Sequence, residues 1–173
     1  KPKTVPQSHA NHAMVYDSVR QRLVVFGGTD ANGNLSDTWE WGGKLTLTAN
    51  TSTISFATGG SQRFTIDAGV ALRNKPYCIF GTITGSIPGI ALTGIHIPLN
   101  PDLYTDLVIK IGNSREFTGF KGVLSATGTA TASLNVTKGL PAVPTTLHHA
   151  FVVYDGTTSQ IFTASNPVTV NLR

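Results

Sequence analysis

Apolar residues along most of this chain fall in short alternating runs rather than in long helical stripes. In the stretch 128–136, every second residue from Ala130 to Val136 is apolar, and the residues between them are Thr, Ser and Asn. The stretches 44–49 and 168–173 alternate in the same way. One buried and one solvated face per strand is typical of packed antiparallel sheets. The pattern therefore predicts an all-β protein with an antiparallel β-sandwich of the immunoglobulin-like or Greek-key kind.

Turn-forming residues separate these runs. Gly, Pro, Asn or Asp stands in nearly every gap, which is where a β-protein changes direction. The gaps divide the second part of the chain into strands expected at 44–49, 52–56, 62–68, 76–83, 92–99, 104–112, 122–126, 128–136, 147–155, 159–165 and 168–173.

No stretch shows a sustained helical period of apolar residues. The nearest candidate is "NPDLYTDLVIKIG", where Asn100 can cap a first turn and Pro101 suits the first helical position. We expect a short helical turn at 101–105, followed by the strand at 104–112.

The first 43 residues have a different organisation. Three short apolar strands, "HAMVYD", "RLVVFGG" and "SDTWEW", are separated by polar turns, and the character of the chain changes near Gly42 and Gly43. We therefore divide the chain into residues 1–43 and residues 44–173.

Residues 12–41 resemble a bacterial kelch repeat, one blade of a β-propeller. The matching residues are His12-Ala13, Tyr16-Asp17, Arg22 to Phe26, Gly27-Gly28, Leu35, Asp37-Thr38-Trp39 and Trp41. The resemblance implies that Trp39 packs over the glycine doublet. A kelch repeat has about 50 residues and normally four strands, so a three- to four-stranded blade is expected. The fourth strand would come from residues 1–8 or from 44–49.

Residues 44–173 resemble the C-terminal β-sandwich domain of large secreted bacterial proteins, often from planctomycetes or myxobacteria. The matching phrases are "LTLTANTSTISFATGGSQRFTIDAG", "GSIPGIAL", "IPLNPDLYTDL", "GLPA", "LHHAFVVYD" and "ASNPVTVNL". This resemblance implies an extracellular setting, often after kelch repeats, and it brings no catalytic residues with it.

The charge distribution, the cysteine content and the lengths of the apolar runs argue against a nucleic-acid partner, a reactive thiol and a membrane span. The net charge is +4 and the isoelectric point about 9.4, but the basic residues are dispersed, so we expect no nucleic-acid partner. Cys78 is the only cysteine, in the apolar context "PYCIFGTI", and is expected to be buried and unreactive. No apolar run has the length of a membrane span, and the start without Met suggests a processed or truncated product.

One polar segment has the composition of a calcium loop. Asp30, Asn32, Asn34 and Asp37 place oxygen ligands close together. However, the glycine is at the fourth loop position rather than the sixth, and no glutamate follows at the twelfth. The alternative is a polar turn between two strands of the blade.

The five histidines are candidate zinc ligands. His148 and His149 are adjacent in an expected strand, so their side chains point to opposite faces. A site would need His96 or His9 from elsewhere in the sequence. The alternative is one buried, hydrogen-bonded histidine and one exposed histidine.

Catalysis is not expected. The nine acidic residues form no recognisable pair, and no serine lies in a nucleophile-elbow pattern. Two aromatic residues, Trp41 and Tyr16, are candidates for stacking against a sugar ring, with packing between sheets as the alternative.

These observations favour a non-catalytic extracellular structural module without a cofactor, and calcium is the alternative to a module without a metal. The blade is expected to contact another copy, in a ring or a filament, or the rest of a propeller. The alternatives are a glycan-binding β-sandwich and a stable C-terminal fragment of a larger secreted kelch protein.

Overall fold

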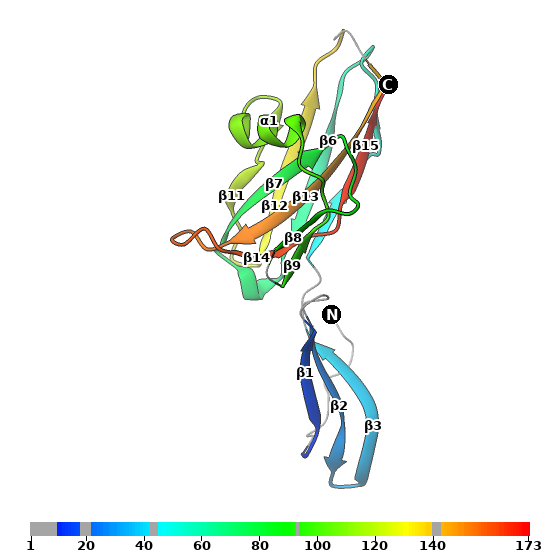
Figure 1. The fold of residues 1–173 in the computed structure, drawn as a ribbon, viewed down its shortest axis with the longest axis vertical. Coiled ribbons are helices and arrows are strands. Elements are labelled where there is room, and N and C mark those ends of the chain that lie inside the picture. Colours follow the sequence, from blue (N-terminus) through cyan, green and yellow to red (C-terminus); the bar gives the residue numbers. More distant parts are fainter. Residues whose placement is uncertain (1–9, 18–21, 42–44, 93, 140–142) are drawn as a thin grey trace. The chain divides into compact units, whose positions relative to one another are not determined.

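A computed structural model describes residues 10–17, 22–41, 45–92, 94–139 and 143–173 (Figure 1). The chain divides into two compact units, Lys1–Lys44 and Leu45–Arg173. Strands dominate both units, and the second also holds one α-helix and one short 3-10 helix. The predicted all-β class is confirmed.

The first unit is a three-stranded antiparallel sheet. Its strands lie in the order β1-β2-β3, with bounds β1 (Ala13–Asp17), β2 (Arg22–Asp30) and β3 (Gly33–Trp41). Each of the three apolar stretches of the sequence therefore forms one strand. Residues 44–49 do not supply a fourth strand, because their strand pairs within the second unit. Residues 1–8 lie outside the described residues.

The glycine doublet allows two segments of the first unit to approach each other. The pairing of β2 with β3 shifts register between Phe26 and Gly28, and Gly27 and Gly28 have φ angles of 58° and 101°. A Cβ atom on Gly28 would stand 2.5 Å from the carbonyl oxygen of Ala10. Only glycine therefore fits this bulge, where Ala10 pairs with Thr29.

The second unit is a sandwich of two sheets. The four-stranded sheet has the order β10-β12-β6-β4, with bounds β10 (Phe117–Thr118), β12 (Thr129–Val136), β6 (Gly60–Asp67) and β4 (Thr46–Ala49). All its pairings are antiparallel. Its strand β6 alternates strictly, because Gln62, Phe64 and Ile66 are buried and their neighbours are exposed.

The six-stranded sheet has the order β11-β7-β13-β15-β5, with β14 also paired to β13. Its strands are β11 (Lys121–Val123), β7 (Pro76–Thr82), β13 (Thr145–Tyr154), β14 (Ile161–Ala164), β15 (Val168–Leu172) and β5 (Thr53–Ile54). Only β5 and β15 run parallel. Between β4 and β7, and again between β10 and β13, successive strands alternate between the two sheets. The predicted sandwich is therefore confirmed.

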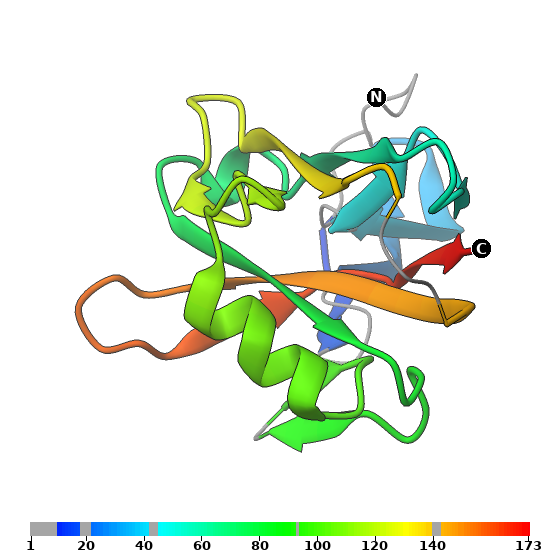
Figure 2. The same cartoon turned by 90° about the horizontal axis from the view of Figure 1, so that it is seen from above.

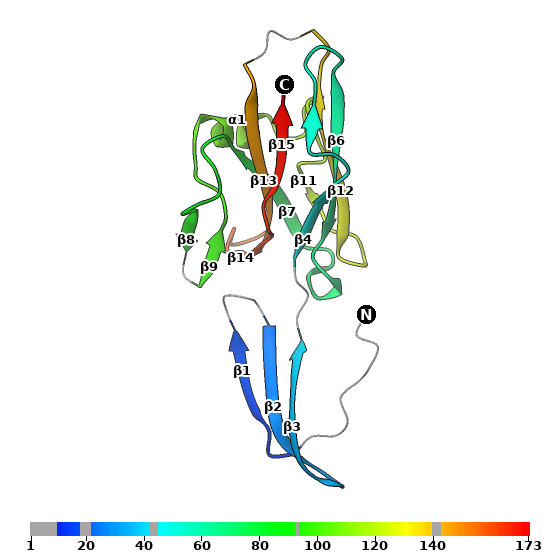
Figure 3. The same cartoon turned by 90° about the vertical axis from the view of Figure 1, so that its right-hand side faces the viewer.

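A third layer covers the outer face of the six-stranded sheet. The helix α1 (Leu103–Ile111) and the hairpin of β8 (Ile90–Leu92) and β9 (Ile95–Ile97) lie on the side of β7 and β13 away from β6 and β12 (Figures 2 and 3). Ile97 and Leu99 form a second core there with Cys78, Ala150 and Val152. Burial on both faces explains why the second half of β13, from Ala150 to Val153, is continuously apolar.

The helix corrects two expectations. Residues 104–112 were expected to form a strand, and the helical turn was expected to end at 105. Instead, α1 runs from Leu103 to Ile111. Its N-cap is Asp102 rather than Asn100, with a capping box between Asp102 and Thr105.

The remaining differences concern short elements. The strand expected at 92–99 is divided between β8 and β9, and the one at 52–56 is reduced to the two residues of β5. The sequence did not indicate β10 or the 3-10 helix Val70–Leu72.

One side chain ties the edge of the four-stranded sheet to the other sheet. Asn166 lies between β14 and β15, and its Oδ1 accepts from the backbone N–H of Leu47 at 3.1 Å. Its Nδ2 donates to the Leu47 carbonyl at 3.0 Å. This amide therefore pairs with the backbone of β4 as a neighbouring strand would, which accounts for Asn166 in the phrase "ASNPVTVNL".

Cys78 is buried and is the only cysteine, as predicted. Burial raises the pKa of its thiol to about 11, although Lys121 acts in the opposite direction. Because the thiolate is the reactive form, we expect Cys78 to react with a disulfide reagent at about pH 8 at least about 100-fold more slowly in the folded chain than in urea. Equal rates in the two states would contradict this placement.

Candidate functional site

The first unit presents apolar side chains on both faces of its sheet. The strand register places Met14 opposite Val25, and Val25 opposite Trp39, so these three share one face. Val15 pairs with Val24, and both point to the other face. We call these the Met14 face and the Val15 face. Tyr16 and Leu23 belong to the Met14 face, and Phe26 belongs to the Val15 face.

Large apolar side chains on both faces are exposed. On the Met14 face, Met14 is 62% exposed and Tyr16 is 60% exposed. On the Val15 face, Val15 is 62% exposed and Phe26 is 57% exposed. By contrast, Val25 in the central strand is buried. A sheet with this distribution leaves apolar area for a partner on either side.

The two sugar-stacking candidates have different outcomes. Tyr16 is exposed and lies beside Met14 on the same face, as described above. Trp41 ends β3, but its side chain lies outside the described residues. The neighbouring Trp39 donates from its indole N–H to the carboxylate of Asp37. Both sugar-stacking residues stay predictions.

The calcium candidates lie in and after a tight hairpin turn. The carboxylate of Asp30 accepts from the backbone N–H of Asn32 at 2.7 Å and from its side-chain amide at 3.4 Å. Asn34 lies in β3 opposite Thr29. Asp37 is three residues further along β3, so its side chain points to the opposite face. Of the four calcium candidates, the structure therefore brings Asp30 and Asn32 together. Asp37 instead accepts the hydrogen bond from Trp39.

The histidines occupy separate positions. His96 bonds through Nε2 with the carbonyl of Pro88 at 2.7 Å, and His148 through Nδ1 with Thr169 at 3.1 Å. His149 is fully buried, as expected for one of the pair, whereas His148 is half-buried rather than exposed. His9 lies outside the described residues. Among the residues that the structure describes, no group of three His, Cys, Asp or Glu side chains is arranged to hold a metal ion.

The carboxylate of Asp102 organises the start of α1 and the loop after β7. Oδ1 accepts from the backbone N–H groups of Tyr104 at 2.9 Å and Thr105 at 3.1 Å. Oδ2 accepts from the N–H groups of Ile83 and Thr84 and from the hydroxyl of Thr82, at 2.7, 3.0 and 2.7 Å. Partial burial raises the pKa of Asp102, but these hydrogen bonds outweigh it and hold the pKa well below its usual range.

A polar pair of the half-buried Tyr104 and the buried His149 joins α1 to the core. The hydroxyl of Tyr104 lies 2.9 Å from Nε2 of His149, and the histidine ring also packs against Phe64 and Phe120. Nδ1 of His149 is buried and has no hydrogen-bond partner among the residues that the structure describes. Burial, helped by His148, lowers the pKa of His149 to about 3, so the ring is neutral near pH 7. Gly81 makes room for Tyr104, because a Cβ atom there would stand 2.4 Å from the tyrosine ring.

An apolar surface surrounds the start of α1. Ile87 and Leu103 are both 85% exposed, and Leu107 follows Leu103 by one helical turn. An apolar pocket of about 300 Å³ lies between α1 and the hairpin, lined mainly by Phe80, Ile97 and Ile109, with Asp106 as its acidic residue. This surface was not predicted from the sequence, because residues 104–112 were expected to form a strand.

No family model matches this chain, and no curated protein is significantly similar to it. The kelch resemblance of the first unit and the resemblance of the second unit to secreted C-terminal domains therefore rest on the residues of the sequence alone. In the part of the chain that the structure describes, the helices are too short or too polar to cross a membrane.

Proposed function

We propose that the protein is a non-catalytic extracellular module that assembles through its first unit. The partner is another copy of the chain, in a ring or a filament, or further blades of a longer propeller. The observation that carries this proposal is the presence of exposed apolar side chains on both faces of one small sheet. In a propeller, the neighbouring blades cover both faces of each blade.

Two further features support assembly. Within the described residues, β1 and β3 are the outer strands of their sheet, and open edges pair readily with another chain. The second unit adds the apolar surface around Ile87 and Leu103. An isolated sheet of this size is marginal in water, so covering its faces stabilises the first unit.

The proposal of a non-catalytic role is supported by the surroundings of the three groups whose pKa values are lowered furthest, Asp102, His149 and Asp155. Perturbed groups often mark active sites. Here, however, the carboxylate of Asp102 is occupied by hydrogen bonds within the fold, and His149 is completely buried. The carboxylate of Asp155 accepts hydrogen bonds from the backbone N–H groups of Thr157 and Thr158 in the turn that follows it. The extracellular setting is supported by the resemblance of residues 44–173 to domains of secreted proteins.

Light scattering on the full chain tests this proposal. We expect a mass above 18.3 kDa that rises with concentration. Met14→Lys and Val15→Lys, one on each face, should each shift the mass toward the monomer, because a charge in a dry interface is costly. Val143→Lys is the matched control, since Val143 is an exposed valine of the second unit.

A monomeric mass leads to a second measurement. For a monomer, we measure the binding of an apolar fluorescent dye. If the dye binds and Met14→Lys abolishes its binding, the apolar face lacks its partner, and that partner is the rest of a propeller. The chain is then a fragment of a larger kelch protein. A monomer that binds no dye at the first unit would overturn the assembly proposal.

Glycan binding is the second candidate function, and the exposure of Tyr16 supports it. An aromatic side chain that is both rigid and exposed can stack against a sugar ring. The surrounding residues favour assembly instead, because Met14 lies on the same face and adds no hydrogen-bonding group for sugar hydroxyls.

A further inference from the structure

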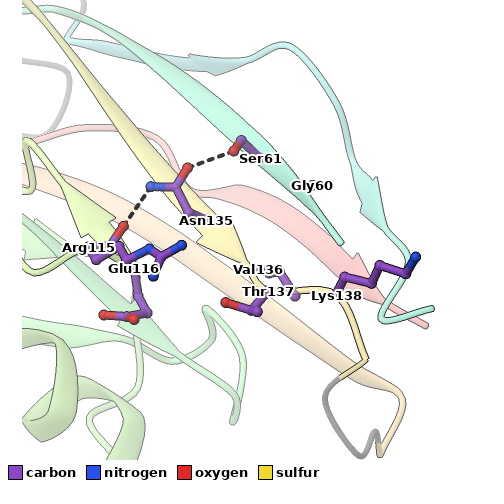
Figure 4. A pocket seen from close by; sticks show the side chains of 8 residues that line it. All are labelled: Gly60, Ser61, Arg115, Glu116, Asn135, Val136, Thr137 and Lys138. Carbon is purple, nitrogen blue, oxygen red and sulfur yellow. Dashed lines mark hydrogen bonds between the residues drawn. The ribbon is translucent and has the colours of Figure 1, made fainter. Parts of the chain in front are cut away.

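A polar pocket of about 300 Å³ lies at the end of the four-stranded sheet where β6 begins and β12 ends (Figure 4). Ser61 on β6 and Asn135 on β12 are paired residues of the sheet and form its floor. Arg115 and Glu116, from the segment between α1 and β10, line one side. Lys138 lines another side and belongs to the turn after β12.

The position of Arg115 is fixed by the sheet. Nδ2 of Asn135 donates to the carbonyl of Arg115 at 2.8 Å, and Oδ1 of Asn135 accepts from the hydroxyl of Ser61 at 2.6 Å. The backbone N–H of Asn135 also donates to the carbonyl of Glu116 at 2.8 Å. Asn135 is therefore a positioning residue that holds the segment carrying Arg115 against β12.

The backbone of Lys138 is fixed by a different contact. Gly59 has a φ angle of 69°, and a Cβ atom there would stand 2.8 Å from the backbone nitrogen of Lys138. The next residue, Gly139, donates its N–H to the carbonyl of Phe56 at 2.8 Å. The lysine side chain points away from the pocket in Figure 4, but its flexible four-carbon stem can carry the ammonium group over the pocket.

The lining combines two cations with one carboxylate. Within the described part of the chain, neither Arg115 nor Lys138 is within ion-pair distance of a carboxylate. Glu116 is held by the hydroxyl of Ser114, which donates to Oε2 at 2.8 Å. This hydrogen bond, above all, lowers the pKa of Glu116 below its usual value. The pocket therefore offers donors for an anionic group and, beside them, an ionised acceptor for hydroxyl groups.

We propose that this pocket binds a sugar acid, such as one uronic acid residue of an acidic polysaccharide. The ligand carboxylate lies on Arg115 and Lys138, and charge-assisted hydrogen bonds to a guanidinium are strong. Glu116 and Thr137 contact the hydroxyl groups. An inorganic phosphate dianion fits less well than a uronate, because it offers at most one hydroxyl donor to Glu116 and carries two negative charges, rather than one, for Glu116 to repel. The site lies entirely in the second unit and does not depend on the assembly proposal.

Calorimetry on the full chain with trigalacturonate as the probe tests the site. We expect saturable binding that Arg115→Ala and Lys138→Ala each weaken by about tenfold, the usual effect of removing one charge-assisted contact. Arg73→Ala removes the same charge from an exposed site beyond the opposite end of β6, and it should change the affinity by less than about twofold. A thermal unfolding curve for each variant verifies that the fold is intact.

Three results would overturn the proposal. The first is no binding of trigalacturonate at millimolar concentration. The second is equal weakening by Arg73→Ala, which would mean general attraction of polyanions to a basic chain. The third is equal affinity for the neutral oligosaccharide maltotriose or for inorganic phosphate, which would remove the requirement for a carboxylate on a sugar.

Discussion

Replacing Asp102 with alanine is expected to lower the free energy of unfolding by about 3 kcal/mol, because one carboxylate supports two segments at once. Its loss removes the cap of α1, which alone contributes about 1 kcal/mol. It also leaves the N–H groups of Ile83 and Thr84 without their charged acceptor. Denaturation by urea at neutral pH measures the change.

Two comparisons make this result specific to Asp102. Asp106→Ala lies on the same helix and should change stability by less than about 0.5 kcal/mol. Asp102→Asn keeps the size of the side chain but turns an NH₂ group toward backbone donors, so it should also be strongly destabilising. If both substitutions at Asp102 behaved like Asp106→Ala, the carboxylate would not organise this region.

The pH dependence of the same carboxylate follows from its pKa, which is lower in the folded chain than in the unfolded chain. The stability that Asp102 contributes is therefore fully present above its unfolded pKa of about 3.9. It is lost as the pH falls below about 4 toward the folded pKa. The Asp102→Ala variant should therefore lose less free energy of unfolding than the wild type when the pH falls below about 4.

His149 is expected to make the protein sensitive to acid at a higher pH. Its pKa is about 3 in the folded chain and about 6.5 in the unfolded chain. Below about pH 6.5 the unfolded state binds a proton that the folded state does not, so stability falls as the pH falls. Between about pH 7.5 and pH 4.5 the loss should reach about 3 kcal/mol, before Asp102 begins to titrate.

A double substitution separates this effect from other titrations. His149→Phe with Tyr104→Phe replaces both hydrogen-bonding partners by apolar rings, so neither polar group remains unpaired. We expect its urea midpoint to be nearly constant between about pH 7.5 and 4.5. His96→Gln changes a histidine at a different position and should keep the wild-type slope. An unchanged slope in the double variant would show that His149 is not the acid-sensitive group.

The sequence predicted the sandwich well where each strand has one wet face. On β6 every second residue from Gln62 to Ile66 is buried, and on β12 the buried residues Ala132 and Leu134 alternate with more exposed polar ones, so alternation alone identifies both strands. It failed at α1 because this helix is apolar on more than its buried side. Val108 is buried, but Leu103, Leu107 and Ile109 are exposed. The helical period is therefore obscured, and "VIKI" reads equally well as a strand.

The candidate sites were harder to predict from the sequence than the fold. The polar pocket unites Ser61, Arg115 and Lys138, which lie far apart along the chain and are brought together by the pairing of β12 with β6 and with β10. The pairing of His149 with Tyr104 likewise depends on how α1 docks. The doublet of histidines did predict that one side chain is buried, because adjacent residues of a strand face opposite sides.

The contact between Asn166 and Leu47 also bears on how the protein ages. Asparagine deamidates when the backbone nitrogen of the next residue attacks the side-chain amide to form a cyclic imide. The next residue here is Pro167, whose nitrogen carries no hydrogen, so this route is closed. Asn32 in the turn of the first unit precedes Gly33, which offers the least hindered nitrogen. Spontaneous chemical damage should therefore reach the hairpin of the first unit long before the amide that holds β4 in the sandwich.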